Sequence, residues 1–212
     1  MMFRYLIGLV LAQNDHCTDQ LAGLPRKRFE SDVLTSLDEP KCPDACCCDT
    51  ESLSCEYEPR IDYAQVDASL FSHVYYEHQK QTAQPPMRQS DRTQEYWARH
   101  NQLTQLDFDE LAKLTSVKMA VFMFNRINTT KFKSDGELAS LEVLELGENW
   151  FTTIDNTMFP MLPNLRNISL ANNRIQKVSA NAFNRYLLTS TKPTLILSKT
   201  KQQKPAGTCF TQ

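Results

Sequence analysis

Apolar residues recur every 24 positions through the second half of this chain, and each recurrence carries an asparagine. Two copies of the pattern match in residue type and spacing throughout. They are Leu141, Leu144, Leu146, Asn149, Phe151, Ile154, Phe159 and Leu162, then Leu165, Ile168, Leu170, Asn173, Ile175, Val178, Phe183 and Tyr186. A fixed period of roughly 20 to 50 residues indicates a repeat architecture in which each unit packs on its neighbours.

Two weaker copies precede these. One contains Val117, Ala120, Phe122, Asn125, Ile127 and Leu138, and the other contains Tyr96, Ala98, Asn101, Leu103, Leu106 and Leu114. After Phe183 the pattern resumes at Leu195 and Leu197 only with an insertion of about three residues. We therefore expect about four repeats over 93–188 and an irregular last strand and tail over 189–212.

Each copy predicts one short strand. Leu144 and Leu146 are two residues apart, so both side chains lie on one face of a strand. Stacking such strands as a parallel sheet buries that face against the neighbouring turns.

The consensus L-x-x-L-x-L-x-x-N-x-[LIF]-x-x-[IV] resembles the leucine-rich repeat family, and the trailing F-x-x-L resembles its extracellular, 24-residue subtype. The resemblance implies an α/β-type solenoid: a horseshoe with short parallel strands on the concave face, and mostly loops and short helical turns on the convex face. In this family the asparagine amide bonds backbone groups of adjacent turns. Because an amide donates and accepts, we expect a buried structural ladder of Asn101, Asn125, Asn149 and Asn173.

The chain begins with features of an export signal. Residues 1–12 combine a basic start, an apolar run from Tyr5 and a small-residue site before Gln13. The alternative is a buried hydrophobic strand. We expect an N-terminal extension over 13–41, and no later segment has the roughly 20 apolar residues that a membrane span needs.

The chain has seven cysteines. The run from Cys42 to Cys48, followed by Cys55, resembles the cysteine-rich cap that precedes extracellular leucine-rich repeats, and the family pairing would give Cys42–Cys48 and Cys46–Cys55. The additional Cys47 is left to pair with Cys17 or Cys209 or to remain reduced. A zinc cluster is disfavoured, because paired cysteines with two-residue spacing are missing, and we predict no metal site. The expected cap spans 42–78.

Between this cap and the clear repeats, the sequence supports two interpretations. Residues 66–76 fit either strands of the cap or a degenerate first repeat. Residues 79–92 are polar and contain Pro85-Pro86, which predicts a loop or insertion. Two sequons, at Asn128 and Asn167, predict glycosylation, the second on the concave face.

Side chains beside the leucine frame point outward from the concave face, where partners of a solenoid bind. The predicted partner-binding residues form an apolar group toward the N-terminal half, with polar neighbours: Trp97, Arg99, Met119, Val121, Met123, Val143 and Glu145. Exposed apolar clusters suggest a partner. The alternative is that the Pro85 segment covers this group, or that Trp97 packs against the cap.

The net charge and the sequence motifs reduce the number of functions that this chain is expected to have. A net charge of -2 and a pI near 6.1 give no indication of nucleic-acid binding. No catalytic motif occurs, the four histidines lack metal-ligand spacing, and no cofactor is expected. The acidic segment 107–110 lacks the glycine and distal glutamate of a calcium loop, so we expect a solvated loop.

These observations predict a non-enzymatic extracellular module, secreted or on the cell surface, whose concave face binds another protein. The alternatives are a structural extracellular-matrix repeat protein or a fragment of a larger receptor or repeat-bearing enzyme. The C-terminal region lacks the family's four-cysteine cap, which predicts self-association through that end.

Overall fold

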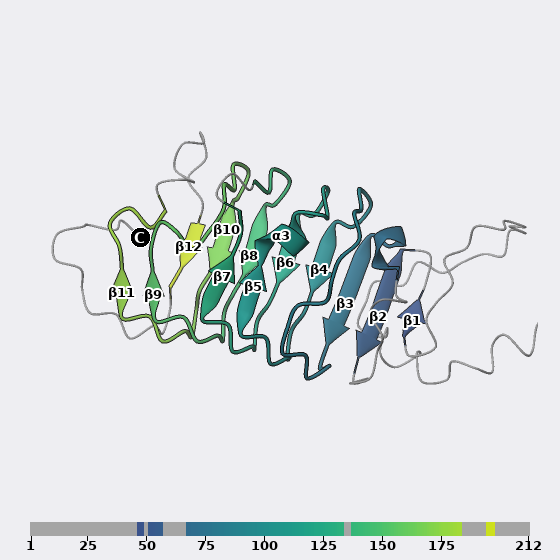
Figure 1. The fold of residues 1–212 in the computed structure, drawn as a ribbon, viewed down its shortest axis with the longest axis horizontal. Coiled ribbons are helices and arrows are strands. Elements are labelled where there is room, and N and C mark those ends of the chain that lie inside the picture. The colour runs from purple at the N-terminus through teal and green to yellow at the C-terminus, as the bar shows by residue number, and fades with distance from the viewer. Residues whose placement is uncertain (1–45, 49–50, 57–66, 134–136, 184–193, 198–212) are drawn as a thin grey trace, which may run out of the picture.

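A computed structural model describes residues 46–48, 51–56, 67–133, 137–183 and 194–197. The described chain forms an elongated coil in which successive turns place their strands side by side (Figure 1). The architecture is a parallel-strand solenoid with few helices, as the sequence predicts.

One sheet runs the length of the coil. Its strands, in spatial order, are β1 (Cys47–Cys48), β2 (Ser52–Glu56), β3 (His73–Glu77), β4 (Glu95–Trp97), β6 (Met119–Val121), β8 (Val143–Glu145), β10 (Asn167–Ser169) and β12 (Thr194–Ile196). All neighbours pair in parallel except β1 and β2, which are antiparallel. The register aligns Ala120 with Leu144 and Leu144 with Ile168, so frame positions stack directly.

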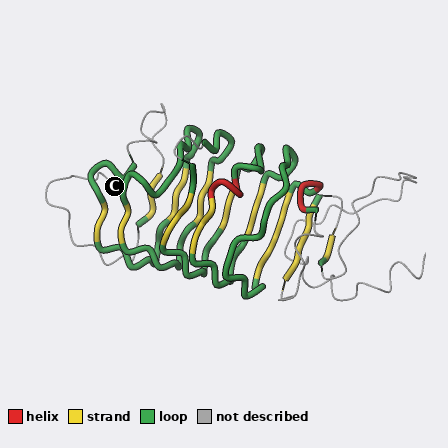
Figure 2. Tube along the Cα trace, viewed as in Figure 1, coloured by secondary structure: helices red, strands yellow, loops and turns green. Residues whose placement is uncertain are grey.

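The other side of the coil carries short elements joined by loops (Figure 2). β5 (Gln105–Asp107) pairs with β7 (Thr129–Lys131), and β9 (Thr153–Ile154) pairs with β11 (Lys177–Val178), both in parallel. The described helices are the single turns η1 (Ala68–Leu70) and α3 (Phe108–Leu111). This arrangement agrees with the predicted loops and helical turns of the convex side.

The repeat frame fills the interior. Leu141, Leu144, Leu146, Phe151 and Ile154 are fully buried, and their equivalents in the following turn are equally enclosed up to Ile175. Tyr186 lies outside the described residues. The last strand pairs Leu195 with Ile168, which is the alignment that an insertion of about three residues produces.

The turn that begins at β3 is a repeat that the 24-residue count does not detect. β3 joins the sheet in register with β4, and it starts 22 residues before Glu95 rather than 24. Segment 79–92 is the loop that returns from β3 to β4, and its Gln79 is buried within the coil. It is therefore part of a turn and not an insertion between cap and repeats.

At the first edge of the sheet, where β1 pairs with β2, a disulfide links Cys46, the residue before β1, to Cys55 in β2. This confirms one of the two pairings that the resemblance implied. Cys47 and Cys48 are disulfide-bonded as well, so Cys47 is not a free thiol. Cys42, Cys17, Cys209 and the proposed signal segment 1–12 lie outside the described residues.

Candidate protein-binding face

The ladder asparagines follow the strands of the sheet, and their hydrogen bonds hold the chain at the point where it leaves each strand. Each amide nitrogen donates to a carbonyl of the preceding turn: Asn125 to Ala98 at 2.8 Å, Asn149 to Phe122 at 2.8 Å and Asn173 to Leu146 at 2.9 Å. Each amide oxygen accepts from a backbone N–H of that same preceding turn, as Asn149 does from Ile127 at 3.0 Å. The four asparagines are buried, so the predicted structural ladder is present.

Gln79 extends the ladder by one position. Its amide donates to the carbonyls of Cys55 and Glu77, while its own backbone N–H donates to Asn101 at 2.9 Å. A glutamine reaches one methylene further than asparagine, and it keeps the amide's capacity to donate and accept. The sequence signal for this turn was Val74 and Tyr76, which are two residues apart and both buried.

The sheet register arranges the outward residues in rows across the strands. The middle row reads Tyr75, Trp97, Val121, Glu145 and Ser169. Flanking rows contain His73, Glu95, Met119, Val143 and Asn167 on one side, and Glu77, Arg99, Met123, Gly147 and Ala171 on the other. All seven predicted partner-binding residues therefore belong to one continuous face.

An aromatic and charged cluster lies toward the N-terminal end of this face. The Trp97 ring lies 5.8 Å from the Tyr75 ring, and the Arg99 guanidinium lies 4.8 Å from the Trp97 ring centre. The Trp97 indole nitrogen donates to Glu95 at 3.2 Å. These contacts hold the indole against the sheet while it remains half-exposed, as amphipathic anchors of interfaces commonly are.

A forked ion pair orients Arg99. Its Nε and Nη2 donate to the two oxygens of Glu77 at 2.6 and 3.0 Å. The Glu77 side chain is 6% exposed, whereas 35% of the Arg99 side chain is accessible. Bidentate pairing fixes the plane of a guanidinium, so Arg99 presents a defined edge beside Trp97. Tyr75 and Glu77 were not among the predicted partner-binding residues, because the sequence left open whether residues 66–76 belong to the cap or to a degenerate first repeat.

The remaining predicted residues differ in accessibility. Met119, Met123, Val143 and Glu145 are half-buried, but Val121 is 2% exposed and contributes support rather than contact surface. Val121 lies in the row between Trp97 and Glu145, so larger neighbours enclose it. The prediction that Val121 is part of the exposed surface is therefore wrong: its side chain lies beneath the neighbouring residues of the patch.

A stack of rings borders the face at the ladder edge. His78 and His100 stack at 4.3 Å, and His100 and Phe124 stack at 4.4 Å, nearly parallel in both cases. All three residues have positive φ, from 54 to 57°. Burial lowers the pKa of His100, and His78 and Arg99 lower it further, whereas Glu77 opposes this shift.

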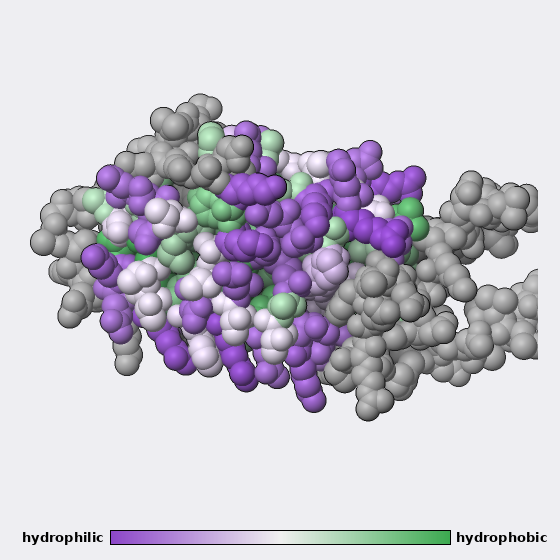
Figure 3. Space-filling view, viewed as in Figure 1, coloured by the Kyte–Doolittle hydropathy of each residue, from purple (hydrophilic) through white to green (hydrophobic). Residues whose placement is uncertain are grey.

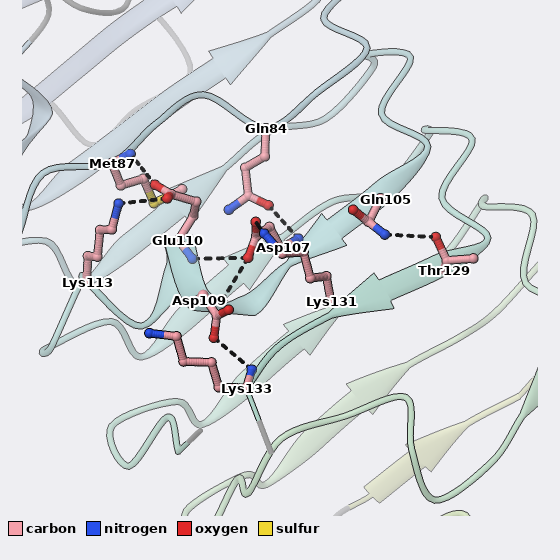
Figure 4. Close-up of polar contacts among 10 residues, drawn as sticks. All are labelled: Gln84, Met87, Gln105, Asp107, Asp109, Glu110, Lys113, Thr129, Lys131 and Lys133. Atoms are coloured by element: carbon pink, nitrogen blue, oxygen red, sulfur yellow. Dashed lines mark hydrogen bonds and ion pairs between the residues drawn. The ribbon is translucent and has the colours of Figure 1, made fainter. Parts of the chain in front are cut away.

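On the other side of the coil, polar contacts around α3 join neighbouring turns (Figure 4). Asp107 caps α3 by accepting from Asp109 N–H at 3.0 Å, and it accepts from the Lys131 ammonium at 2.9 Å. The latter contact raises the pKa of Lys131. The segment 107–110 is thus a capped helical turn, not the solvated loop that we predicted. The described surface that faces the viewer in the orientation of Figure 1 is mainly hydrophilic (Figure 3).

The asparagine of each predicted sequon is exposed, whereas Ser169 of the second sequon is buried. Asn128 is exposed next to β7, and Asn167 is exposed at the start of β10 on the concave face. Glycosylation of these residues stays a prediction. Within the described ranges, no three histidine, cysteine or acidic residues are grouped to hold a metal. No described helix has the length and apolarity to cross a membrane.

The stacked parallel strands and the internal asparagine ladder define a solenoid protein built from short, similar turns. Residues 123–188 match the family described as leucine rich repeat. This segment therefore consists of leucine-rich repeats, and the described turns on either side of it continue the same solenoid. A search of curated proteins finds no match. Members of this family typically act as protein-interaction modules rather than enzymes.

Proposed function

We propose that this leucine-rich repeat protein recognises another protein through the concave face, with Trp97 and Arg99 at the centre of contact. The supporting observation is the cluster of Tyr75, Trp97, Glu77 and Arg99, in which a half-exposed indole is held by ring and guanidinium contacts. Trp, Tyr and Arg are the residues most enriched among interface hot spots. A pre-oriented cluster also loses little side-chain entropy on binding.

The neighbouring residues suit a protein surface better than a small ligand. Met119, Met123 and Val143 are half-buried around the cluster, and Val121 lies beneath it. Apolar residues with charged groups beside them are the usual form of an interface core and rim. Flexible methionines adapt to the shape of a partner.

The test is a screen of purified extracellular proteins by surface plasmon resonance, followed by variants of this chain. We expect Trp97→Ala to weaken a saturable partner by at least roughly tenfold, because truncation of a central aromatic typically has that effect. Arg166→Ala, at an exposed arginine paired with Glu142, is the matched control. A partner bound equally well by the Trp97 variant would refute this assignment, as would a screen without a saturable partner.

The proposal includes an extracellular setting. It is supported by the disulfide-bonded cysteines 46, 47, 48 and 55, because disulfides persist in oxidising compartments. The exposed asparagines of the two sequons, Asn128 and Asn167, are compatible with it. Protein collected from the medium of secreting cells should lose mass on glycosidase treatment, and Asn128→Gln and Asn167→Gln should each remove part of that shift. Retention inside the cells would count against the proposal.

Self-association is the second candidate, as expected of a structural matrix protein. The observation that favours it is β12, which pairs with β10 and carries Ile196 with 41% exposure. Strand edges and exposed apolar residues promote pairing with further copies. Light scattering over a concentration series distinguishes the two candidates: a rising mass that Ile196→Lys abolishes supports self-association, and a constant monomer mass excludes it.

A further inference from the structure

A second group of ordered side chains lies along the edge of the sheet that carries the ladder asparagines. It is separate from the cluster of Tyr75, Glu77, Trp97 and Arg99. Arg126, Trp150 and Arg174 each follow a ladder asparagine, so they occupy the same position in three consecutive turns. Their backbone N–H groups donate to the preceding turn at Leu103, Ile127 and Phe151, with distances of 2.9 to 3.0 Å. The repeat therefore holds the backbone of these three residues in one row along the coil.

The side chains of this row contact one another. The Arg126 guanidinium lies 5.7 Å from the Trp150 ring centre, and the Arg174 guanidinium lies 4.5 Å from it. The two arginines come from the turns before and after Trp150. Cation–π contacts of this kind orient a guanidinium without using its hydrogen-bond donors, which remain available to a ligand.

Neither arginine has an acidic partner within the part of the chain that the structure describes. Arg88, Arg99 and Arg166 pair with Asp67, Glu77 and Glu142, whereas Arg126 and Arg174 are exposed and make no such pair. Glu148, two residues before Trp150, accepts from Asn172 at 2.7 Å instead. Among the described residues, the row therefore presents two cations without an acidic partner beside an aromatic ring.

Apolar surface adjoins these cations. Trp150 is 39% exposed, and Phe124, two residues before Arg126, is 42% exposed. Phe124 reaches this edge because it adopts a left-handed backbone conformation, with φ of 57°, and its ring stacks on His100. We call Phe124, Arg126, Trp150 and Arg174 the edge strip.

The chemistry of the edge strip indicates its occupant. A flat ligand, such as a sugar ring, would have to displace a guanidinium to stack on Trp150. An extended acidic peptide needs no displacement, because carboxylates bind the outward donors of arginine in a forked geometry and apolar side chains contact the ring edges. We propose that the edge strip docks an acidic segment of a partner protein, independently of the Trp97 cluster.

Fluorescence anisotropy with a labelled peptide of alternating glutamate and leucine tests this proposal. We expect saturable binding that weakens with added salt, because exposed charges are screened. Arg126→Gln with Arg174→Gln should weaken binding by roughly tenfold. Arg88→Gln with Arg166→Gln removes the same charge from paired positions, and it should change affinity by less than about twofold.

Further comparisons make the result specific. Arg126→Lys with Arg174→Lys keeps both positive charges but removes the guanidinium groups that can bind a carboxylate through two donors. An affinity between those of the wild type and the double glutamine variant supports bidentate recognition. A peptide with lysine in place of glutamate should not bind. No saturable binding to the wild-type chain, or equal losses in both double glutamine variants, overturns the proposal. Heparin binding at the strip without acidic-peptide binding also overturns it, in favour of a polysaccharide.

Discussion

At the scale of single residues, the ladder asparagines decide whether the coil closes. Asn149 alone donates to Phe122, Leu146 and Gly147 and accepts from Ile127, so one side chain satisfies four backbone groups. No other residue type of this length both donates twice and accepts from the same position. The residue before each ladder amide, from His78 to Asn172, has a left-handed backbone conformation. This conformation is unfavourable for most side chains.

We expect Asn149→Ala to lower the free energy of unfolding by about 3 kcal/mol or more, because buried backbone groups lose their partners. Urea denaturation followed by circular dichroism measures the change. Asn156→Ala, at an exposed asparagine outside the ladder, should stay within about 0.5 kcal/mol. Similar losses in the two variants would show that the ladder is not a major source of stability.

We expect His100, in the ring stack, to make stability dependent on pH. The pKa of His100 is lowered in the fold, first by burial and then by His78 and Arg99, so the unfolded chain binds this proton more readily. Stability from His100 is therefore complete above its ordinary pKa of about 6.5 and decreases as pH falls through that value toward the lowered one.

His100→Phe removes this proton while keeping a ring beside Phe124. Between about pH 7.5 and 5.5, the wild-type chain should lose more of its free energy of unfolding than the His100→Phe variant does. Denaturation midpoints at both pH values give the comparison. Parallel pH profiles for the two proteins would contradict the assignment of this dependence to His100.

At the scale of elements, α3 shows how a short helix forms from capping. Asp107 ends β5 and caps α3, accepting from the N–H groups of Asp109 and Glu110 at 3.0 and 3.4 Å. Glu110 in turn accepts from Met87 N–H at 2.7 Å, which ties the helix to the preceding turn. Capping residues satisfy the first N–H groups that a helix leaves unpaired.

Replacing the cap separates its two contributions. Asp107→Ala should lower stability by about 1 kcal/mol, because Ala is a poor N-cap. Asp107→Asn keeps an accepting oxygen but loses the negative charge that faces Lys131, and we expect a clearly smaller loss. Thermal unfolding of both variants measures this difference. An equal loss in both would assign the effect to the ion pair instead of the cap.

At the scale of the whole molecule, each turn packs mainly on the turns before and after it. Leu144 is fully buried, and the register places it between Ala120 and Ile168. In such arrays stability is approximately a sum of local terms and neighbour interfaces. Disturbance of one turn should therefore spread by proximity along the coil.

Leu144→Ala should cost about 2–5 kcal/mol, through lost burial and the cavity that remains. Hydrogen exchange measured by mass spectrometry should accelerate most in the turns of Ala120 and Ile168, and least around Val74. Met161→Ala, at a 41% exposed position, is the control and should leave exchange unchanged. Uniform acceleration along the coil would indicate that all turns unfold as one unit.

The sequence alone determined the repeat, the strands, the buried frame and the asparagine ladder, because each follows from side-chain spacing that recurs in every turn. It also placed Trp97 and Arg99 on the outward face. It left open whether residues 66–76 belong to the cap or to a degenerate first repeat, because the spacing of the β3 turn and its Gln79 depart from the consensus.

Only the tertiary structure decided which outward residues are accessible and which form clusters. Val121 is enclosed by its row neighbours, Glu77 orients Arg99, and Arg126, Trp150 and Arg174 meet across three turns. The physical reason is that exposure and pairing depend on the neighbours that the strand register brings together. These neighbours are about 24 residues apart in the chain, and their side chains vary freely between repeats.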